Sequence, residues 1–221
     1  MHKVVLISLR GYREWTESLG PRREHIIQKV QARIHGALWS SFTAVGALPH
    51  HFRYDYLIAL ANNVPRHWID TAVAKIRRSS PVEVDYCIGM GETPLDAYRS
   101  CGEHKEGKES NAVVAHVDIV NSTDATRING PIHTYLRALD MLRTAAGACE
   151  DVGCIAFYLG GDNMVVYLPE PKAIYALLDR VEAPVRAGVG VSPRPYTAFV
   201  KATKGLDALR AENKTGVKVV R

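Results

Sequence analysis

The sequence predicts an α+β fold made of two tandem ferredoxin-like units, each with an antiparallel sheet. Three observations predict it. The order of apolar segments in residues 1–103 recurs in residues 112–221, and the polar, charged segment 104–111 separates them as a linker. Short stretches also correspond, since Ile88-Gly89-Met90-Gly91 resembles Ala187-Gly188-Val189-Gly190. Each half reads β-α-β-β-α-β with a further helix, which is the ferredoxin-like order.

The first half begins with an apolar strand, Val4–Leu9, and continues with an amphipathic helix over 22–42 that follows Pro21. One face of this helix carries Ile26, Val30, Ile34 and Leu38. The remaining expected elements are two strands within 52–61, a helix over 65–77, a strand over 82–90 and a helix over 94–101.

The second half follows the same order, beginning with a strand over 113–119 and a helix over 131–149. The apolar face expected for that helix consists of Ile132, Tyr135, Leu139 and Leu142. A hairpin follows, with strands over 154–159 and 164–168 joined through Gly160-Gly161. The last expected elements are a helix over 171–181, a strand over 185–191 and a helix over 195–210.

Composition excludes several classes of protein. The chain has 221 residues, of which 47% are hydrophobic and 23% charged, as in ordinary globular proteins. No apolar run approaches the ~18 residues of a membrane-spanning helix, and no signal peptide is recognisable, so we expect a cytoplasmic protein with no membrane partner. The net charge of +5 is scattered, which argues against nucleic acid and suits an anionic small ligand.

The cysteines do not form a recognisable metal motif. Cys87, Cys101, Cys149 and Cys154 contain no C-x-x-C pair, and a chain of this length does not need disulfides to fold. We therefore expect buried free thiols, with a zinc site as a minor alternative.

Two carboxylates are the candidate metal ligands. Asp118 ends an apolar strand, and Asp162 lies in the Gly160-Gly161-Asp162-Asn163 turn of the hairpin. In a ferredoxin-like sheet these strands are neighbours, so Asp118 and Asp162 should lie at one edge. Two unpaired carboxylates there would repel, and a bound divalent cation removes that penalty. Oxygen ligands favour Mg²⁺ or Mn²⁺.

The surrounding residues suit a phosphate. Gly160 and Gly161 permit positive φ and leave room for a phosphate or a base, although Gly-Gly-Asp-Asn by itself is also a common hairpin turn. The turn Asn121-Ser122-Thr123 offers backbone N–H groups and hydroxyls, close to the start of the next expected helix, over 131–149.

These motifs resemble the archaeal GTP cyclohydrolase III family, also called GTP cyclohydrolase IIa, over essentially the whole chain. The segments that carry the resemblance are 12–16, 21–24, 52–59, 91–94, 115–123, 160–163 and 187–190. The units of that family are similar to the palm domains of nucleotidyl cyclases and diguanylate cyclases, in which two Asp-bound metals act on a nucleoside triphosphate.

The resemblance implies hydrolysis of GTP at C8 of the imidazole ring with the formyl group retained, and release of two phosphates. The implied product is 2-amino-5-formylamino-6-(5-phosphoribosylamino)pyrimidin-4(3H)-one, an early intermediate for riboflavin and deazaflavin coenzymes. It also implies dependence on one or two Mg²⁺ ions held by Asp118, the Ile119 carbonyl and Asp162. The implied substrate-binding residues are Asn121, Ser122, Thr123, Gly160, Gly161, Asn163 and Arg210. The base for ring opening is undetermined, with His116, Glu92 and Asp55 as candidates.

The first half departs from the family pattern. Arg10 stands where some members carry an acid, so we expect a pseudo-unit without a metal pair, in which Asp55 meets Arg53 or Arg10. Arg23 could bind substrate phosphate or form a helix-start ion pair. Alternative functions are a nucleotidyl cyclase, which Asn163 disfavours, and a non-catalytic GTP sensor. Exposed sheet edges suggest a homo-oligomer.

Overall fold

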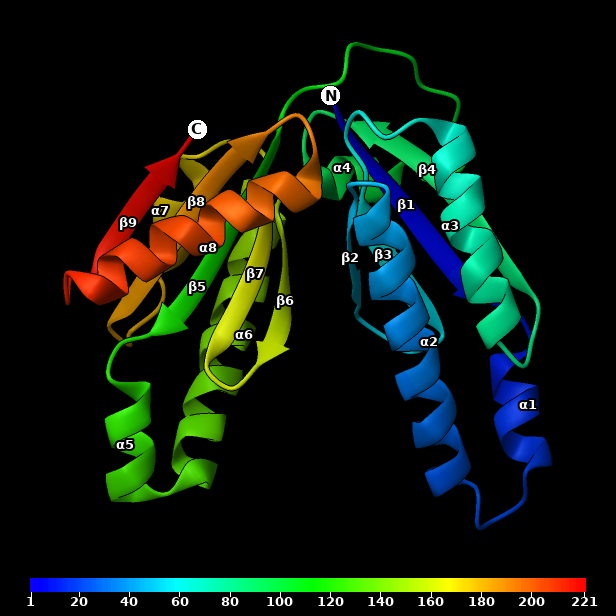
Figure 1. Cartoon of the computed structure of the whole chain (residues 1–221), viewed down its shortest axis with the longest axis horizontal. Coiled ribbons are helices and arrows are strands. Elements are labelled where there is room, and N and C mark those ends of the chain that lie inside the picture. Colours follow the sequence, from blue (N-terminus) through cyan, green and yellow to red (C-terminus); the bar gives the residue numbers. More distant parts are fainter.

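The computed structural model describes all 221 residues and contains two sheets with their helices (Figure 1). In the N-terminal unit the strand order is β2-β3-β1-β4, and all neighbouring strands are antiparallel. Its strands are β1 (His2–Leu9), β2 (Leu48–His51), β3 (Tyr56–Leu60) and β4 (Val84–Gly91). Its helices are α1 (Tyr12–Ser18), α2 (Glu24–Ala44), α3 (Arg66–Ser79) and α4 (Pro94–Arg99).

The C-terminal unit repeats this topology with one additional strand. Its sheet has the order β6-β7-β5-β8-β9, in which β9 pairs with β8 in parallel and the other pairs are antiparallel. The strands are β5 (Ala112–Ile119), β6 (Ile155–Gly160), β7 (Asn163–Leu168), β8 (Val185–Ser192) and β9 (Gly216–Val220). The helices are α5 (Ser122–Asn129), α6 (Pro131–Val152), α7 (Ala173–Leu178) and α8 (Pro195–Ala211). The predicted α+β fold with two tandem ferredoxin-like units is confirmed.

Several elements differ from the prediction. The short helices α1 and α5, which directly follow the first strand of each unit, and the final strand β9 were not predicted. The strand pair expected within 52–61 begins earlier, because β2 ends at His51 and residues 52–55 form the turn. None of the helices has the length and apolar composition needed to cross a bilayer.

The predicted buried face of α6 is wrong for the first half of the helix. Ile132 is 74% exposed and Tyr135 is 50% exposed, because this part of α6 extends beyond the sheet and packs beside α5 (Figure 1). The residues of α6 that enter the core are Ala138, Met141, Ala145, Ala148 and Cys149. In α2 the predicted face is confirmed at Ile34 and Leu38, which are buried, and at Val30, which packs against the core. Only Ile26 departs from it and lies at the surface.

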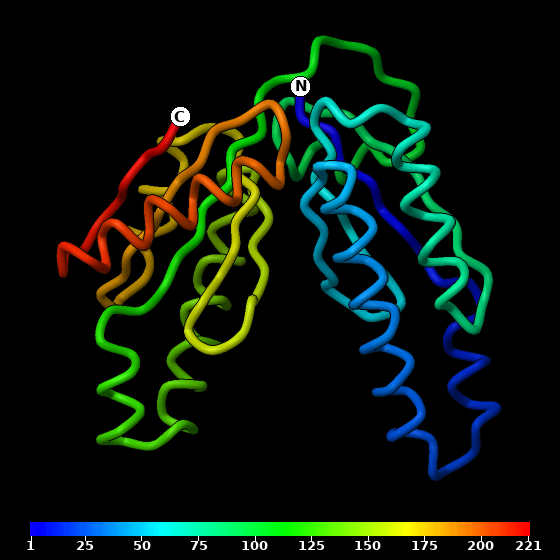
Figure 2. Tube along the Cα trace, in the orientation of Figure 1, coloured from blue at the N-terminus to red at the C-terminus, as the bar shows by residue number.

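Both units share one core where their sheets meet. Each unit has its own core between sheet and helices, and a third cluster joins Leu48, Ile58 and Leu60 to residues of the other unit such as Phe157 and Tyr167. The hydroxyl of the fully buried Tyr167 donates to the Leu48 carbonyl at 2.7 Å. The two units therefore meet along one side and diverge below it, as the chain trace shows (Figure 2).

Polar contacts add to this junction. The Arg194 guanidinium donates to the Val45 carbonyl at 3.0 Å and lies 5.0 Å from the centre of the Trp68 ring. The Leu95 amide, at the start of α4, donates to the Gly153 carbonyl at 3.1 Å. Residues 102–108 of the connecting segment are exposed, whereas Glu109 binds the Lys3 ammonium at 2.6 Å. The later part of the connection is thus attached to the N-terminal unit.

The expectation of free thiols is wrong, because all four cysteines form disulfides. Cys87 on β4 is bonded to Cys101, which follows α4, with their Cα atoms 5.6 Å apart. Cys149 near the end of α6 is bonded to Cys154, with a Cα–Cα distance of 4.6 Å. The first pairing depends on α4 folding back onto β4, and the second on the left-handed turn at Gly153. Neither contact follows from cysteine spacing alone.

The Gly-x-Gly pairs of β4 and β8 allow a helix to lie directly on the strand. A Cβ atom added at Gly188 would lie 1.9 Å from the Ala202 carbonyl oxygen of α8, and one at Gly89 would lie 1.9 Å from the Ala97 carbonyl oxygen of α4. Side chains at these positions would force the helices off the sheet.

Gly188→Ala should therefore lower the free energy of unfolding by about 1–3 kcal/mol, the usual cost of overpacking a core. Denaturant unfolding of the purified chain measures it. Gly147→Ala is the matched control, because Gly147 is an exposed position within α6 with no atom near the added methyl group. That change should stabilise the protein slightly. Equal effects of the two substitutions would contradict the close approach of α8.

Candidate functional site

The candidate site lies where β5 ends beside the turn between β6 and β7. Asp118 pairs in register with Asn163, the first residue of β7, and Asp162 directly precedes it. The Asn163 side-chain amide donates to Asp162 Oδ1 at 3.1 Å. The structure thus brings Asp118 and Asp162 together at one edge of the sheet, as the ferredoxin-like topology requires.

Asp118 is a buried carboxylate with one oxygen unused. Its side chain is 5% exposed, its Oδ2 accepts from Arg210 Nε at 2.8 Å, and Arg186 Nη1 lies 3.9 Å away. Its Oδ1 is buried and has no hydrogen-bond partner. Burial raises the pKa of this carboxyl, the charge of Asp162 adds to the rise, and Arg210 opposes it. A buried carboxylate oxygen normally has a hydrogen-bond donor or a cation beside it, and Asp118 Oδ1 has neither.

A hydrogen-bonded network links Asp118 to His116. Arg210 also donates to Asn163 Oδ1 at 3.3 Å, and His116 Nε2 lies 3.1 Å from the same oxygen. The other ring nitrogen of His116 is 3.0 Å from Thr203 Oγ1 of α8. Burial lowers the pKa of His116, so the ring is neutral at pH 7. His116 therefore reaches the carboxylates through Asn163, and both of its nitrogens have partners.

A polar cavity of about 470 Å³ adjoins the turn. Ser122 and Thr123 line it from the start of α5, where Asn121 adopts a left-handed conformation (φ 58°), and Gly161 and Asp162 line it from the turn. Gly160 has φ 105° and Gly161 has φ 60°, values that favour glycine. The hydroxyls of Ser122 and Thr123 make no hydrogen bond within the chain, so they are free to bind a ligand.

The equivalent place in the N-terminal unit carries different chemistry. Ser8 holds the register position that Asp118 holds in the second unit, and Asp55 corresponds to Asp162. Asp55 is held by Arg53, whose Nε and Nη2 donate to its two carboxylate oxygens at 2.9 and 2.8 Å. The predicted pairing of Asp55 with Arg53 is confirmed. Arg53 and Tyr54 stand where the second unit has its two glycines, so this turn leaves no comparable space.

Arg23 is the one predicted substrate-binding residue that the structure does not bring to the site. It directly precedes α2 in the N-terminal unit, and its Nε lies 3.9 Å from the neighbouring Glu24 carboxylate. The helix-start ion pair is therefore the arrangement observed.

Three residues of the site were missed from sequence. Arg186 lies opposite Asp118 on β8, Arg127 lines the polar cavity from α5, and Tyr158 lines it from β6. The sequence did indicate Arg186, because a charged residue within an apolar strand almost always has a partner of opposite charge. Arg127 could not be found because α5 itself was not predicted.

The donors at this edge fit a magnesium ion better than a zinc ion. No group of three or more His, Cys, Asp or Glu side chains is arranged to hold a metal. Two carboxylates, one with a buried unpartnered oxygen, match the incomplete protein shell of Mg²⁺, which phosphate oxygens and water complete. Asp118, Asp162 and the Ile119 carbonyl stay the predicted ligands.

Arg210→Met should lower the free energy of unfolding by about 1–3 kcal/mol, because it leaves the Asp118 carboxylate buried without its strongest partner. Adding Asp118→Asn to that variant should recover part of the loss. Denaturant unfolding at pH 7 measures both changes. Arg143→Met removes an exposed pair with Asp140 and should cost less than about 0.5 kcal/mol. Equal losses in Arg210→Met and Arg143→Met would contradict the buried pair.

Known proteins resemble this chain in sequence and, more distantly, in structure. The sequence model described as GTP cyclohydrolase III matches the chain twice, over residues 4–110 and 100–221. A GTP cyclohydrolase III from Pyrobaculum calidifontis is 59% identical over 100% of both chains, and one from Aeropyrum pernix is 31% identical over 99% of this chain and 96% of its own. Among solved structures, a GGEEF domain of a diguanylate cyclase from Vibrio cholerae covers 51% of this chain and 84% of its own, with 12% identity and a TM-score of 0.44. The chain belongs to the GTP cyclohydrolase III family.

Proposed function

We propose that this protein is a Mg²⁺-dependent GTP cyclohydrolase. One water adds at C8 of guanine and the C8–N9 bond breaks, so that the formyl group stays on N7. Two further waters cleave the phosphoanhydride bonds and release two phosphates. The product is then 2-amino-5-formylamino-6-(5-phosphoribosylamino)pyrimidin-4(3H)-one, which we assign to riboflavin and deazaflavin synthesis.

The observation that carries the proposal is the buried, unpartnered Asp118 Oδ1 beside Asp162 and the double-glycine turn. The family relation supports GTP as the substrate, since relatives over the full length of the chain are named GTP cyclohydrolase III. A site with an unused carboxylate oxygen and free hydroxyls suits a metal-bound triphosphate.

Residues of the polar cavity would bind the phosphates. The hydroxyls of Ser122 and Thr123 and the free N–H groups at the start of α5 would donate to phosphate oxygens. The positive φ values of Gly160 and Gly161 let the backbone approach the triphosphate without side chains between them. Arg127 is exposed at the cavity, and its contact with Asp124 is long, at 3.4 Å. Its guanidinium would add a cation to the phosphate site.

Asp118 and Asp162 would hold the Mg²⁺, with the Ile119 carbonyl as a further oxygen ligand. When bound, the ion supplies charge neutralisation and polarisation of phosphoryl oxygens. Arg210 already offsets the charge of Asp118 and lies beside Asn163. His116 would hold the Asn163 side chain in place. We therefore assign His116 as a positioning residue and not as the base for ring opening.

Asp162→Asn should abolish GTP turnover while the protein stays folded, because it removes one anionic ligand and leaves the hairpin intact. Purified enzyme with GTP and Mg²⁺ is followed by ultraviolet absorbance, which changes when the imidazole ring opens, and by release of inorganic phosphate. Asp151→Asn, at an exposed position on α6, is the matched control and should retain full activity.

Other outcomes identify the competing functions. Release of pyrophosphate with the purine spectrum unchanged would indicate a nucleotidyl cyclase, and binding without any product would indicate a GTP sensor. Full turnover by Asp162→Asn would exclude the proposed ligand pair.

Removal of the metal is a separate test. EDTA should stop both ring opening and phosphate release, and excess Mg²⁺ should restore them, because phosphate charge in the cavity would otherwise meet two carboxylates. Undiminished turnover of metal-free protein in EDTA would contradict the Mg²⁺ assignment.

A further inference from the structure

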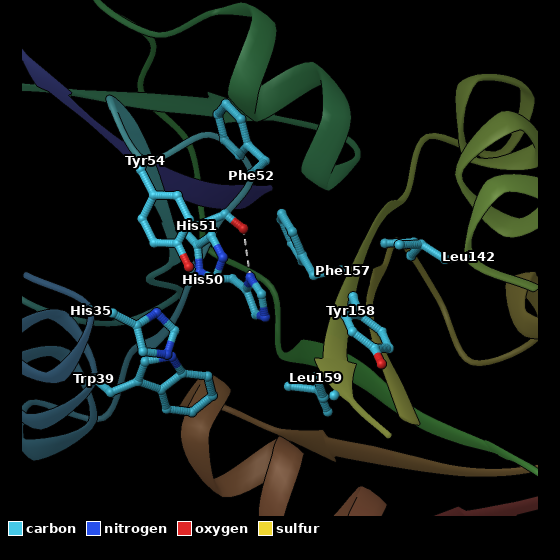
Figure 3. Close-up of a pocket in the computed structure, with 12 residues that line it drawn as sticks. His35, Trp39, His50, His51, Phe52, Tyr54, Leu142, Phe157, Tyr158 and Leu159 are labelled. Carbon is cyan, nitrogen blue, oxygen red and sulfur yellow. Dashed lines mark hydrogen bonds between the residues drawn. The ribbon is translucent and has the colours of Figure 1, made fainter. Parts of the chain in front are cut away.

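A second cavity, also of about 470 Å³, lies between the two units, where the edge strands β2 and β6 face each other (Figure 3). His35 and Trp39 of α2 and His50 and His51 of β2 line one side. Phe157 and Tyr158 of β6 line the other. This cavity belongs to neither unit alone, and the predicted metal site does not include its residues.

The walls of this cavity are aromatic rings. The His50 and Phe157 rings stack across the two units with centroids 4.7 Å apart and an interplanar angle of 14°. His51 stacks on Tyr54 at 4.5 Å and 22°. Flat, polarisable surfaces of this kind bind planar rings by stacking or by edge-to-face contact.

Three of the residues that line this cavity have a ring nitrogen without a hydrogen-bond partner. Trp39 Nε1, His35 Nδ1 and His51 Nδ1 are all buried, and none of them makes a hydrogen bond. A buried donor or acceptor without a partner costs free energy, so three of them around one cavity indicate a ligand that can pair with them.

The cavity carries no charge. None of its lining residues is Asp, Glu, Lys or Arg. Burial lowers the pKa of His50 and of His51 to about 4, so both rings are neutral at pH 7. An anionic phosphate would find no cation here, whereas an uncharged ring needs none.

We propose that this cavity binds an uncharged planar heteroaromatic ring of purine type. The ring packs against the aromatic side chains, accepts a hydrogen bond from the Trp39 indole N–H, and pairs with the free ring nitrogens of His35 and His51. Two sources offer this chemistry, the guanine base of the substrate and a separate purine. The first source rests on the proposed function. It is geometrically suited, because Tyr158 lines both this cavity and the polar cavity beside Asp162.

Calorimetric titration of the full chain with guanosine, in EDTA at pH 7, tests the proposal. Guanosine carries the ring without phosphate, so binding does not depend on the metal. Trp39→Phe and His51→Phe keep an aromatic ring and remove the polar nitrogen atoms, and each should weaken binding about tenfold. Trp15→Phe, on α1 and outside the cavity, should bind like the wild type. Thermal unfolding checks that each variant is folded.

Asp162→Asn separates this proposal from the proposed function, since it should bind guanosine normally even though it is expected to be inactive. Competition of guanosine with GTP, seen as a rise in KM at constant kcat, would identify the ring as the substrate's own base. Simultaneous binding of both would identify a separate purine. Absence of guanosine binding by the wild type, or equal binding by the wild type, Trp39→Phe and His51→Phe, would overturn the proposal.

Discussion

The contact between the inner faces of the two sheets is the constraint on which the rest of the structure depends. Each sheet buries one face under its own helices, and Phe157 and Tyr167 of the second unit bury part of the other face against Leu48 and its neighbours. Strands buried on both faces must be apolar on both, which accounts for continuous runs such as Val113–Ala115. The same contact sets the edge strands β2 and β6 opposite each other.

Duplication gave this chain two similar backbones with different chemistry. Ser8 and Asp118 occupy equivalent places, and the Arg53-Tyr54 turn corresponds to Gly160-Gly161. In one unit an arginine neutralises the remaining aspartate, while in the other a carboxylate oxygen stays without a partner. Strand pairing depends on backbone hydrogen bonds and not on these side chains. The residues at the strand ends could therefore diverge while the sheets were retained.

Much of this architecture could be predicted because it depends on local patterns. Apolar strands, the double-glycine hairpin and the repeated order were sufficient to predict the topology, and the topology was sufficient to bring Asp118 beside Asp162. The first turns of α2 and α6 were harder, because both helices extend past their sheets there and expose Ile26 and Ile132, which periodicity alone assigns to the core. The cavity between the units could not be predicted, since it depends on how the units pack. His50 and Phe157 are far apart in sequence and meet only there.

The two disulfides lie on either side of one contact between the units. Cys101 follows α4, whose Leu95 amide donates to the Gly153 carbonyl, and Gly153 lies directly before Cys154 in the loop that the second disulfide closes. Each side of this contact is thus braced by a covalent bond within its own unit, so that α4 and the loop at Gly153 are both held in place where the two units touch.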